Sequence, residues 1–439
     1  MKTDSFMNAK VMSSDPATAL RITRENPVRW IVVGQLLDAK HRRILKNAHL
    51  VYDRNRILHV GVEAPDATIL NGQKNPDLRL PEYTAMPGLI EGHSHTFLEG
   101  AELAAEKRGE YQKQDPQLLY EKAEARLRIL ARLGVIAMRD GGDKDQVGLR
   151  LSRLTASKDC PSFTARVLSP GPGIHRQGRY GSFFGKPLED HANIESCVQA
   201  RVDEGADHIK IVPTGIINFA KGQVIAKPQF SAEEIQQFKN AAGALQKHVM
   251  AHASGDTGVG YAIEGGVDTL EHGFFVTDDQ LGKMRDRAVS WVPTFAPVQE
   301  QVDHSDIMGW TGETLDHLTR ILENHARSLQ KALAIGVNVL VGSDSGSCGV
   351  AHGTGLFYEM ELLENAGMPT LDILCQATYG NNEALTNRQP YGSLEAGFKP
   401  RFIVTKHNPL ETARNLFLEK WVVFDGEAES SATVILENL

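Results

Sequence analysis

Short apolar runs alternate with longer amphipathic stretches through the middle of the chain. Eight of these runs have the length of buried strands, and glycine or polar residues bound most of them. Strands that alternate with helices predict a parallel sheet, and eight such units close most economically into an α/β fold of the (β/α)8 TIM-barrel type. The candidate strands are Ala85–Ile90, Val135–Met138, Ala165–Leu168, His208–Val212, Val249–Ala251, Thr269–Leu270, Trp291–Val292 and Asn338–Val341.

Helix start and stop signals lie between these candidate strands. Asp115 is placed to cap a helix that has Pro116 at its first position, and Gly134 follows its end. Ser231 and Glu234 have the spacing of a capping box, in which each side chain binds the other's backbone N–H. These signals predict helices in the order that a barrel requires.

The two ends of the chain have a different pattern, with β-rich runs and hairpin-type turns. The runs are Trp30–Val33 and Ala48–Tyr52 near the start, and Phe402–Thr405 and Trp421–Phe424 near the end. Neither end has enough strands for a stable sheet of its own, so we expect both to form one small β-sandwich domain. The predicted parts are an N-terminal arm (1–27), a composite β-sandwich (28–85 and 388–439) and a barrel (86–387).

Composition and charge exclude several other classes of protein. The 439 residues include 47 Lys and Arg against 55 Asp and Glu, a net charge of −8 without a basic stripe, so no nucleic-acid partner is expected. No apolar run approaches the roughly 18 residues of a membrane span, and residues 1–27 lack the apolar core of a secretory signal. The 4 cysteines are widely spaced, which indicates reduced thiols and a cytoplasmic protein.

Histidine and aspartate side chains follow the candidate strands at their carboxyl ends. His93 and His95 end the first strand, and their alternation turns both imidazoles to one side. His252, His272 and Asp344 each follow a later strand. Because the carboxyl ends of barrel strands meet at one face, these residues predict a shared site for a divalent metal ion.

Lys210 lies inside the apolar run His208–Val212, where a buried ammonium group is costly. One explanation is a buried ion pair with Asp140 or Asp207. The other is a neutral amine that adds carbon dioxide to form a carbamate. Because a carbamate is anionic and has two oxygens, it can bridge two metal ions where the bare amine cannot.

These motifs together resemble the amidohydrolase superfamily over nearly the whole chain. Lys210, and the absence of a Glu just after His252, resemble the branch of imidazolonepropionase, prolidase-like dipeptidases and ochratoxin-degrading amidases. Members of that branch with this lysine carry two metal ions bridged by a carboxylated lysine. Four segments are similar to the first, second, sixth and eighth strand signatures, in that order: Ala85–His95, Gly134–Asp140, Asp268–Gly273 and Gly342–Gly346. A fifth segment, Gly392–Gly397, is similar to the stretch where such chains return to the small domain.

The resemblance implies two divalent metal ions, with zinc as the first choice and manganese, iron or cobalt as alternatives. It also implies a homo-oligomer. Asp344 would be the catalytic residue, which accepts a proton from the attacking water and delivers it to the departing nitrogen. The implied ligands are His93 and His95 for the first metal, His252 and His272 for the second, Lys210 as a bridging carbamate, and Asp344 on the first metal.

The loop after the third strand, residues 171–186, differs from the Gly-His-Gly stretch that dipeptidases of this branch tend to carry. It reads Gly-Ile-His-Arg-Gln-Gly-Arg-Tyr-Gly from residue 173. We expect His175 or Tyr180 to contact the tetrahedral intermediate, and Arg179 to bind a substrate carboxylate with its planar donors. The alternative is a solvated surface loop.

The sequence therefore predicts an enzyme, a metal-dependent hydrolase of amide-type C–N bonds. The expected partner is a small-molecule amide, either a dipeptide or an N-acyl amino acid. The alternatives are a cyclic-amide, aryl-amide or urea hydrolase on the same site, a mononuclear deaminase, and a scaffold protein that has lost its metals. The segment 253–255 after His252 has no Glu for a deaminase, and the complete ligand set argues against a scaffold.

Overall fold

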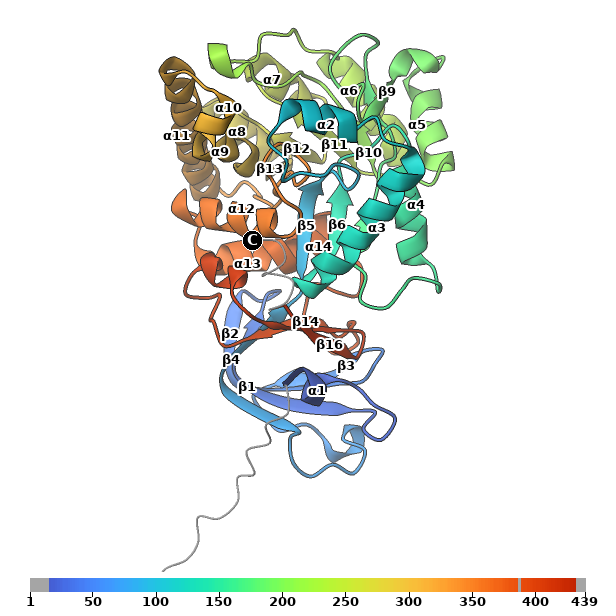
Figure 1. Cartoon of the computed structure of the whole chain (residues 1–439), viewed down its shortest axis with the longest axis vertical. Helices are drawn as coiled ribbons and strands as arrows, with labels where there is room; N and C mark the ends of the chain where they lie inside the picture. The colour runs from blue at the N-terminus through green and yellow to red at the C-terminus, as the bar shows by residue number, and fades with distance from the viewer. Residues whose placement is uncertain (1–15, 386–387, 432–439) are drawn as a thin grey trace, which may run out of the picture.

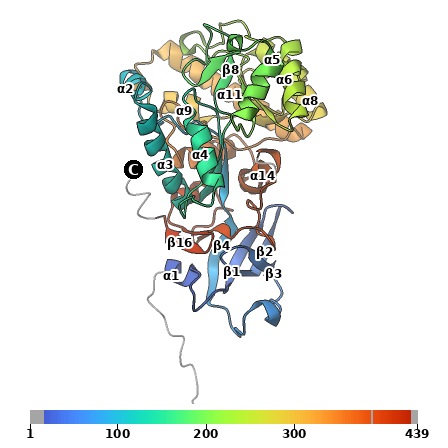
Figure 2. The same cartoon turned by 90° about the vertical axis from the view of Figure 1, so that its right-hand side faces the viewer.

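The computed structural model describes residues 16–385 and 388–431, so most of the predicted N-terminal arm lies outside the described residues. Its described part contains the short helix α1 (Pro16–Leu20). Two views at right angles place a small sheet at one end of the molecule and a larger α/β part at the other (Figure 1 and Figure 2).

The small part is one mixed sheet with strands from both ends of the chain. Its strand order is β16-β15-β14-β4-β1-β2-β3. In this order β14, from near the end of the chain, pairs antiparallel with β4, from near its start. The strands are β1 (Arg29–Asp38), β2 (Arg43–Tyr52), β3 (Ile57–Gly61), β4 (Leu78–Pro87), β14 (Arg401–Thr405), β15 (Trp421–Phe424) and β16 (Glu427–Ser430).

This sheet folds over on itself. Tyr52 on β2 and Phe402 on β14 lie three strand positions apart in the sheet order, and a flat sheet would separate them by about 14 Å. Their ring centroids are only 5.1 Å apart, and both side chains belong to one buried cluster with Ile31, Leu50 and Val404. The predicted sandwich is therefore one continuous sheet whose two halves face each other, rather than two separate sheets.

The larger part is a TIM-barrel-like α/β domain with parallel strands. One sheet has the order β5-β6-β7 and the other the order β13-β12-β11-β10-β8-β9. Isolated parallel bridges join Trp291 to Val339 and Ser94 to Ser345. The strands are β5 (Leu89–Ser94), β6 (Val135–Asp140), β7 (Arg166–Leu168), β8 (Gly173–His175), β9 (Gly185–Pro187), β10 (Ile209–Ile211), β11 (Val249–Ala253), β12 (Thr269–His272) and β13 (Ser290–Val292).

Three predicted strands differ from the observed ones. The run Ala85–Ile90 spans the end of β4 and the start of β5, and a Cβ at the intervening Gly88 would lie 2.3 Å from Ile136 Cγ2. The third predicted strand, 165–168, forms only the short β7, and Pro170 and Pro172, which lack N–H donors, separate it from β8. The last predicted strand, 338–341, forms only an isolated bridge.

Helices separate most of these strands, and two of the predicted caps are confirmed. Asp115 accepts a hydrogen bond from the Gln117 N–H at 2.8 Å, and Ser231 and Glu234 form the capping box in both directions. No described helix is long and apolar enough to cross a membrane. The helices after α1 are α2 (Ala105–Tyr111), α3 (Pro116–Arg132), α4 (Val147–Ala156), α5 (Ile194–Asp203), α6 (Ala232–Ala244), α7 (Asp256–Glu264), α8 (Asp278–Asp286), α9 (Ala296–Asp303), α10 (Ser305–Met308), α11 (Gly312–Ile335), α12 (Thr354–Asn365), α13 (Thr370–Cys375) and α14 (Asn381–Leu385).

Candidate metal centre

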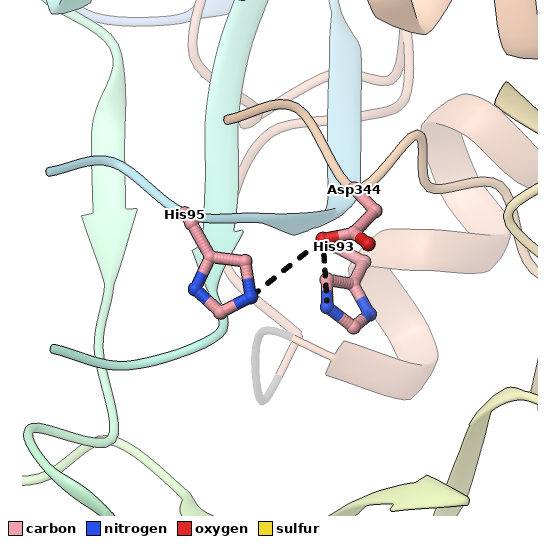
Figure 3. A group of neighbouring side chains, drawn as sticks. All are labelled: His93, His95 and Asp344. Atoms are coloured by element: carbon pink, nitrogen blue, oxygen red, sulfur yellow. Dashed lines mark ion pairs between the residues drawn. The ribbon is translucent and has the colours of Figure 1, made fainter. Parts of the chain in front are cut away.

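Three of the six predicted ligands form a compact buried cluster. His93 lies on β5, His95 follows the end of that strand, and Asp344 lies in the loop beyond the last predicted strand. The Asp344 carboxylate lies close to both imidazoles (Figure 3), with its Oδ1 at 3.5 Å from His93 Nε2 and 3.6 Å from His95 Nε2. One potential ligand atom of each residue lies within 4.8 Å of the others, a spacing that suits a single cation.

The other three predicted ligands lie beside this cluster. His252 on β11 and His272 at the end of β12 have ring centroids 4.6 Å apart, and the His272 ring lies 5.0 Å from that of His93. Lys210, in the middle of β10, is buried, with 1% of its surface exposed. Parallel neighbouring strands thus bring residues that are far apart in the sequence to one end of the domain.

Four buried polar atoms at this site have no hydrogen-bond partner among the described residues. They are His93 Nε2, Lys210 Nζ, His252 Nε2 and Asp344 Oδ1. A buried polar atom without a partner costs about 1–3 kcal/mol. Imidazole nitrogens and carboxylate oxygens are metal ligands, so divalent cations would supply the missing partners. The donor set therefore fits a metal centre.

The opposite ring nitrogens of the histidines are held by the protein. His93 Nδ1–H donates to Glu271 Oε2 at 2.7 Å, and His95 Nδ1–H donates to the Gly142 carbonyl at 3.2 Å. Arg139 in turn donates to Glu271 Oε1 at 2.8 Å. Fixing Nδ1 in this way directs Nε2 toward the site and leaves its lone pair available.

Sequence reasoning missed the roles of Glu271 and Arg139. Both side chains are buried and lie on apolar strands, β12 and β6. A buried charge is costly unless it is paired. Two opposite charges on apolar strands were therefore the signal that could have predicted this internal ion pair.

Replacing Glu271 by Gln is expected to weaken metal binding about 10- to 100-fold, because the carboxylate no longer orients His93 or raises its basicity. Titration of the metal-free protein against a competing chelator measures this change. Glu323→Gln on the exposed surface of α11 is the matched control and should leave the affinity unchanged. An unchanged affinity in Glu271→Gln would show that the Glu271 hydrogen bond does not support the metal centre.

Burial sets the protonation of the predicted ligands. It lowers the pKa of His95 and of His252 to about 3, so both imidazoles are neutral at physiological pH, as metal ligands must be. It also lowers the pKa of Lys210 to about 8, against the opposing charges of Glu271 and Asp344. Burial raises the pKa of Asp344 to about 7.

The predicted ion pair of Lys210 is not formed among the described residues. Asp140 accepts hydrogen bonds from Thr96 and Ser169 instead, and Asp207 accepts them from Ser152 and Ser169. The Lys210 amine is therefore buried without a hydrogen-bond partner among the described residues, and its carbamate stays a prediction.

Two of the predicted ligands have a strained backbone. His272 has φ 67° and Asp344 has φ 57°, in the left-handed region that residues with a Cβ rarely adopt. Such a conformation costs about 1–3 kcal/mol and is found mainly where a site requires it. The strained backbone of His272 and Asp344 therefore supports a functional role for these two residues.

A cavity of about 410 Å³ lies over the candidate ligands and is lined by five of them, His95, Lys210, His252, His272 and Asp344. The rest of its wall is mostly apolar and aromatic. The volume and character are those of a site for a small organic molecule. The apolar wall includes Phe183, Phe184, Ile217, Phe219, Phe274 and Trp310.

The three predicted substrate-binding residues lie in different environments. Tyr180 lines the cavity, and its ring centroid is 5.4 Å from that of His252. His175 is buried, and its Nδ1–H donates to the Arg176 carbonyl at 2.8 Å. Arg179 donates to the backbone carbonyl of Lys227 and does not line the cavity. The substrate roles of these residues stay predictions.

The chain belongs to the amidohydrolase family, whose model matches residues 84–436. Over 257 residues the chain is 25% identical to an ochratoxinase of Aspergillus niger, a match that covers 56% of this chain and 49% of the relative. The matched segment thus spans about half the length of that relative.

Solved structures share the fold. A Xaa-Pro dipeptidase with methionine bound in its active site is similar with a TM-score of 0.76 and 24% identity, over 92% of this chain and 99% of the other. The A. niger ochratoxinase structure is similar with a TM-score of 0.76 and 21% identity, over 91% and 95% of the two chains. These similarities agree with a TIM-barrel-like domain joined to a sheet domain.

Family membership confirms the predicted superfamily, and it supports an enzyme that acts on amide bonds. Members of the amidohydrolase family generally use divalent metal ions, which agrees with the cluster of His93, His95 and Asp344.

Proposed function

We propose that this protein is a metal-dependent hydrolase of amide-type C–N bonds, and that its substrate is a dipeptide or an N-acyl amino acid. The observation that carries the proposal is the group of buried ligand atoms without partners beneath the cavity, in a chain of the amidohydrolase family. The similarity to a Xaa-Pro dipeptidase and to an ochratoxinase supports the substrate class.

Two divalent cations, with zinc as the first choice, would be held by this chain's own residues. His93, His95 and Asp344 would hold the first cation, because their ligand atoms already lie close together. His252 and His272 would hold the second cation, because their rings are neighbours. When bound, divalent metals lower the pKa of a water molecule and polarise a carbonyl group.

Lys210 would hold the two cations together as a carbamate. Its Nζ lone pair forms a bond to the carbon of carbon dioxide and the nitrogen loses a proton, which gives an anionic group with two oxygens. The reaction needs the neutral amine. With a pKa of about 8, about one lysine in ten is neutral at pH 7, whereas an ordinary lysine is almost entirely charged.

Asp344 would move the proton in the reaction. Its Oδ1 faces His93 and His95 and accepts no hydrogen bond from the described residues. This oxygen can therefore accept a proton from the attacking water and deliver it to the departing nitrogen, the role of a general base followed by a general acid.

We further propose that the strands close into a complete ring of eight. The ring would consist of β5, β6, the interrupted pair β7 and β8, then β10, β11, β12 and β13, and the segment 339–345. The bridge from Trp291 to Val339 supports the join of this last segment to β13, and the bridge from Ser94 to Ser345 supports its join to β5.

A second candidate function is the hydrolysis of aryl amides or aryl ureas at the same site. The observation that favours it is the aromatic wall of the cavity, which includes Phe183, Phe219 and Trp310. An aryl group would pack on these rings without any need for a charged partner.

The purified protein is expected to hold two divalent metal ions per chain and to hydrolyse members of a panel of dipeptides and N-acyl amino acids. Elemental analysis gives the metal content, and assays with and without a chelator show whether turnover depends on it. Turnover of aryl amides and ureas alone would favour the second candidate. A chain that binds one metal and leaves Lys210 unmodified would contradict the binuclear centre.

A further inference from the structure

Arg108 on α2 is a cation in an otherwise mostly apolar cavity. Two of the described residues that line this cavity are Lys or Arg, namely Arg108 and Lys210. Lys210 belongs to the candidate metal centre. Arg108 also lines an adjacent cavity of about 720 Å³ on the α2 side, which shares Leu98 and Gln112 with the first. Arg108 thus lines both cavities.

Neutral groups hold the Arg108 side chain in place. Its Nη1 donates to the carbonyls of Gly100 and Glu102, both at 3.3 Å, and its Nη2 donates to the Gly346 carbonyl at 3.0 Å. A guanidinium has five donor protons. The Nε–H and the second proton of Nη2 therefore make no hydrogen bond to the described residues, and both can bind a ligand.

The positive charge of Arg108 has no carboxylate partner within 4.0 Å in residues 16–385 and 388–431. Its neighbour Lys107 pairs with Glu102, and Arg176 pairs with Glu189 and Glu234. Arg108 is thus oriented by carbonyl groups alone, while its charge and part of its fork are free to bind an anion.

Arg108 is also tied to the segment that carries Asp344. The carbonyl that accepts from Nη2 belongs to Gly346, in the same loop, and the positive charge of Arg108 acts to lower the pKa of Asp344. A carboxylate on Arg108 would therefore lie in the same cavity as the proposed reaction centre.

Part of the apolar wall belongs to a separate buried cluster, whereas Phe184 belongs to the main core and Phe183 packs against it. Ile217, Phe274 and Val298 form the core of the separate cluster, and Phe219 and Trp310 pack against them. This wall would receive an uncharged, bulky group of the same substrate.

We propose that Arg108 binds a carboxylate of the substrate and thereby selects amides with a free carboxylate and a bulky apolar group over their neutral analogues. The inference rests on the proposed hydrolase function and moves the carboxylate contact from Arg179, where the sequence placed it, to Arg108. Arg is suited to this role because its planar donors match the two oxygens of a carboxylate.

The test compares an N-acyl amino acid that has an aromatic side chain with its C-terminal carboxamide. The wild-type protein should prefer the acid. Arg108→Met should lower kcat/KM for the acid about 10- to 150-fold, mainly through KM, and remove the preference over the carboxamide. Arg108→Lys, which keeps the charge but not the fork, should retain part of the preference. The inhibition constants of the free amino acid and its amide give a second readout of the same contact.

Arg179→Met is the matched control and should retain the preference for the acid. Metal content and thermal unfolding confirm that each variant is folded and loaded. An equal loss for the acid and the carboxamide in both Arg108 variants would overturn the proposal, because it would indicate a structural role through Gly346. A selective loss in Arg179→Met instead would overturn it as well. If the wild type hydrolyses both compounds equally, Arg108 does not select a carboxylate; if it hydrolyses no amide in the wider panel, the proposed function itself fails.

Discussion

Lys210→Ala is expected to remove most of the metal and to reduce hydrolysis by more than 100-fold. The substitution deletes the proposed bridge, so the second cation keeps only two histidine ligands, and loss of even a supporting residue costs 10- to 100-fold. Metal content per chain and kcat/KM measure the two effects. Added bicarbonate or short carboxylic acids should restore a fraction of the activity, because they can occupy the space of the missing side chain.

The chain offers a matched control for this experiment. Lys420 is also a buried lysine, and burial lowers its pKa to about 7. Its amine, however, donates a hydrogen bond to the Leu416 carbonyl. Lys420→Met should therefore leave metal content unchanged. Two metal ions retained in Lys210→Ala would exclude the bridging carbamate.

Asp344→Asn is expected to lower kcat about 10²- to 10⁴-fold at saturating metal. The amide keeps the size of the side chain and one oxygen, but it cannot accept a proton from water, and general acid–base catalysis is worth a factor of this size. Metal affinity should fall too, because the carboxylate charge is lost. Asp306→Asn on the exposed side of α10 is the control. Turnover close to that of the wild type would remove Asp344 from the proposed proton transfer.

The candidate ligands were predictable because each depends on a local rule. Alternation along a strand places His93 and His95 on one side, and the position of Asp344 after an apolar run places it at a strand end. The structure brings these three residues together. The helix caps at Asp115 and Ser231 follow from the same kind of local signal, since a cap involves only its own first turn.

Features that depend on contacts between distant segments were not predictable from one sequence. The place of Arg108 in the cavity depends on how α2 packs against the loop of Gly346, more than two hundred residues later. The hydrogen bond from Arg179 to the Lys227 carbonyl was not predictable for the same reason, because it joins two separate segments of the chain. Similarly, the folding of the small sheet onto itself depends on the contact of Tyr52 with Phe402, which no local pattern specifies.

The pairing of β4 with β14 has a consequence for synthesis of the chain on the ribosome. β4 is complete when Pro87 emerges, but its partner begins only at Arg401. At 5–20 residues per second, one edge of β4 lacks its partner strand for about 15–60 s. Unpaired edges are where chains aggregate, so newly made protein should depend on chaperones during this interval. The α/β domain is thus joined to a sheet that is completed only after β14, β15 and β16 have been made.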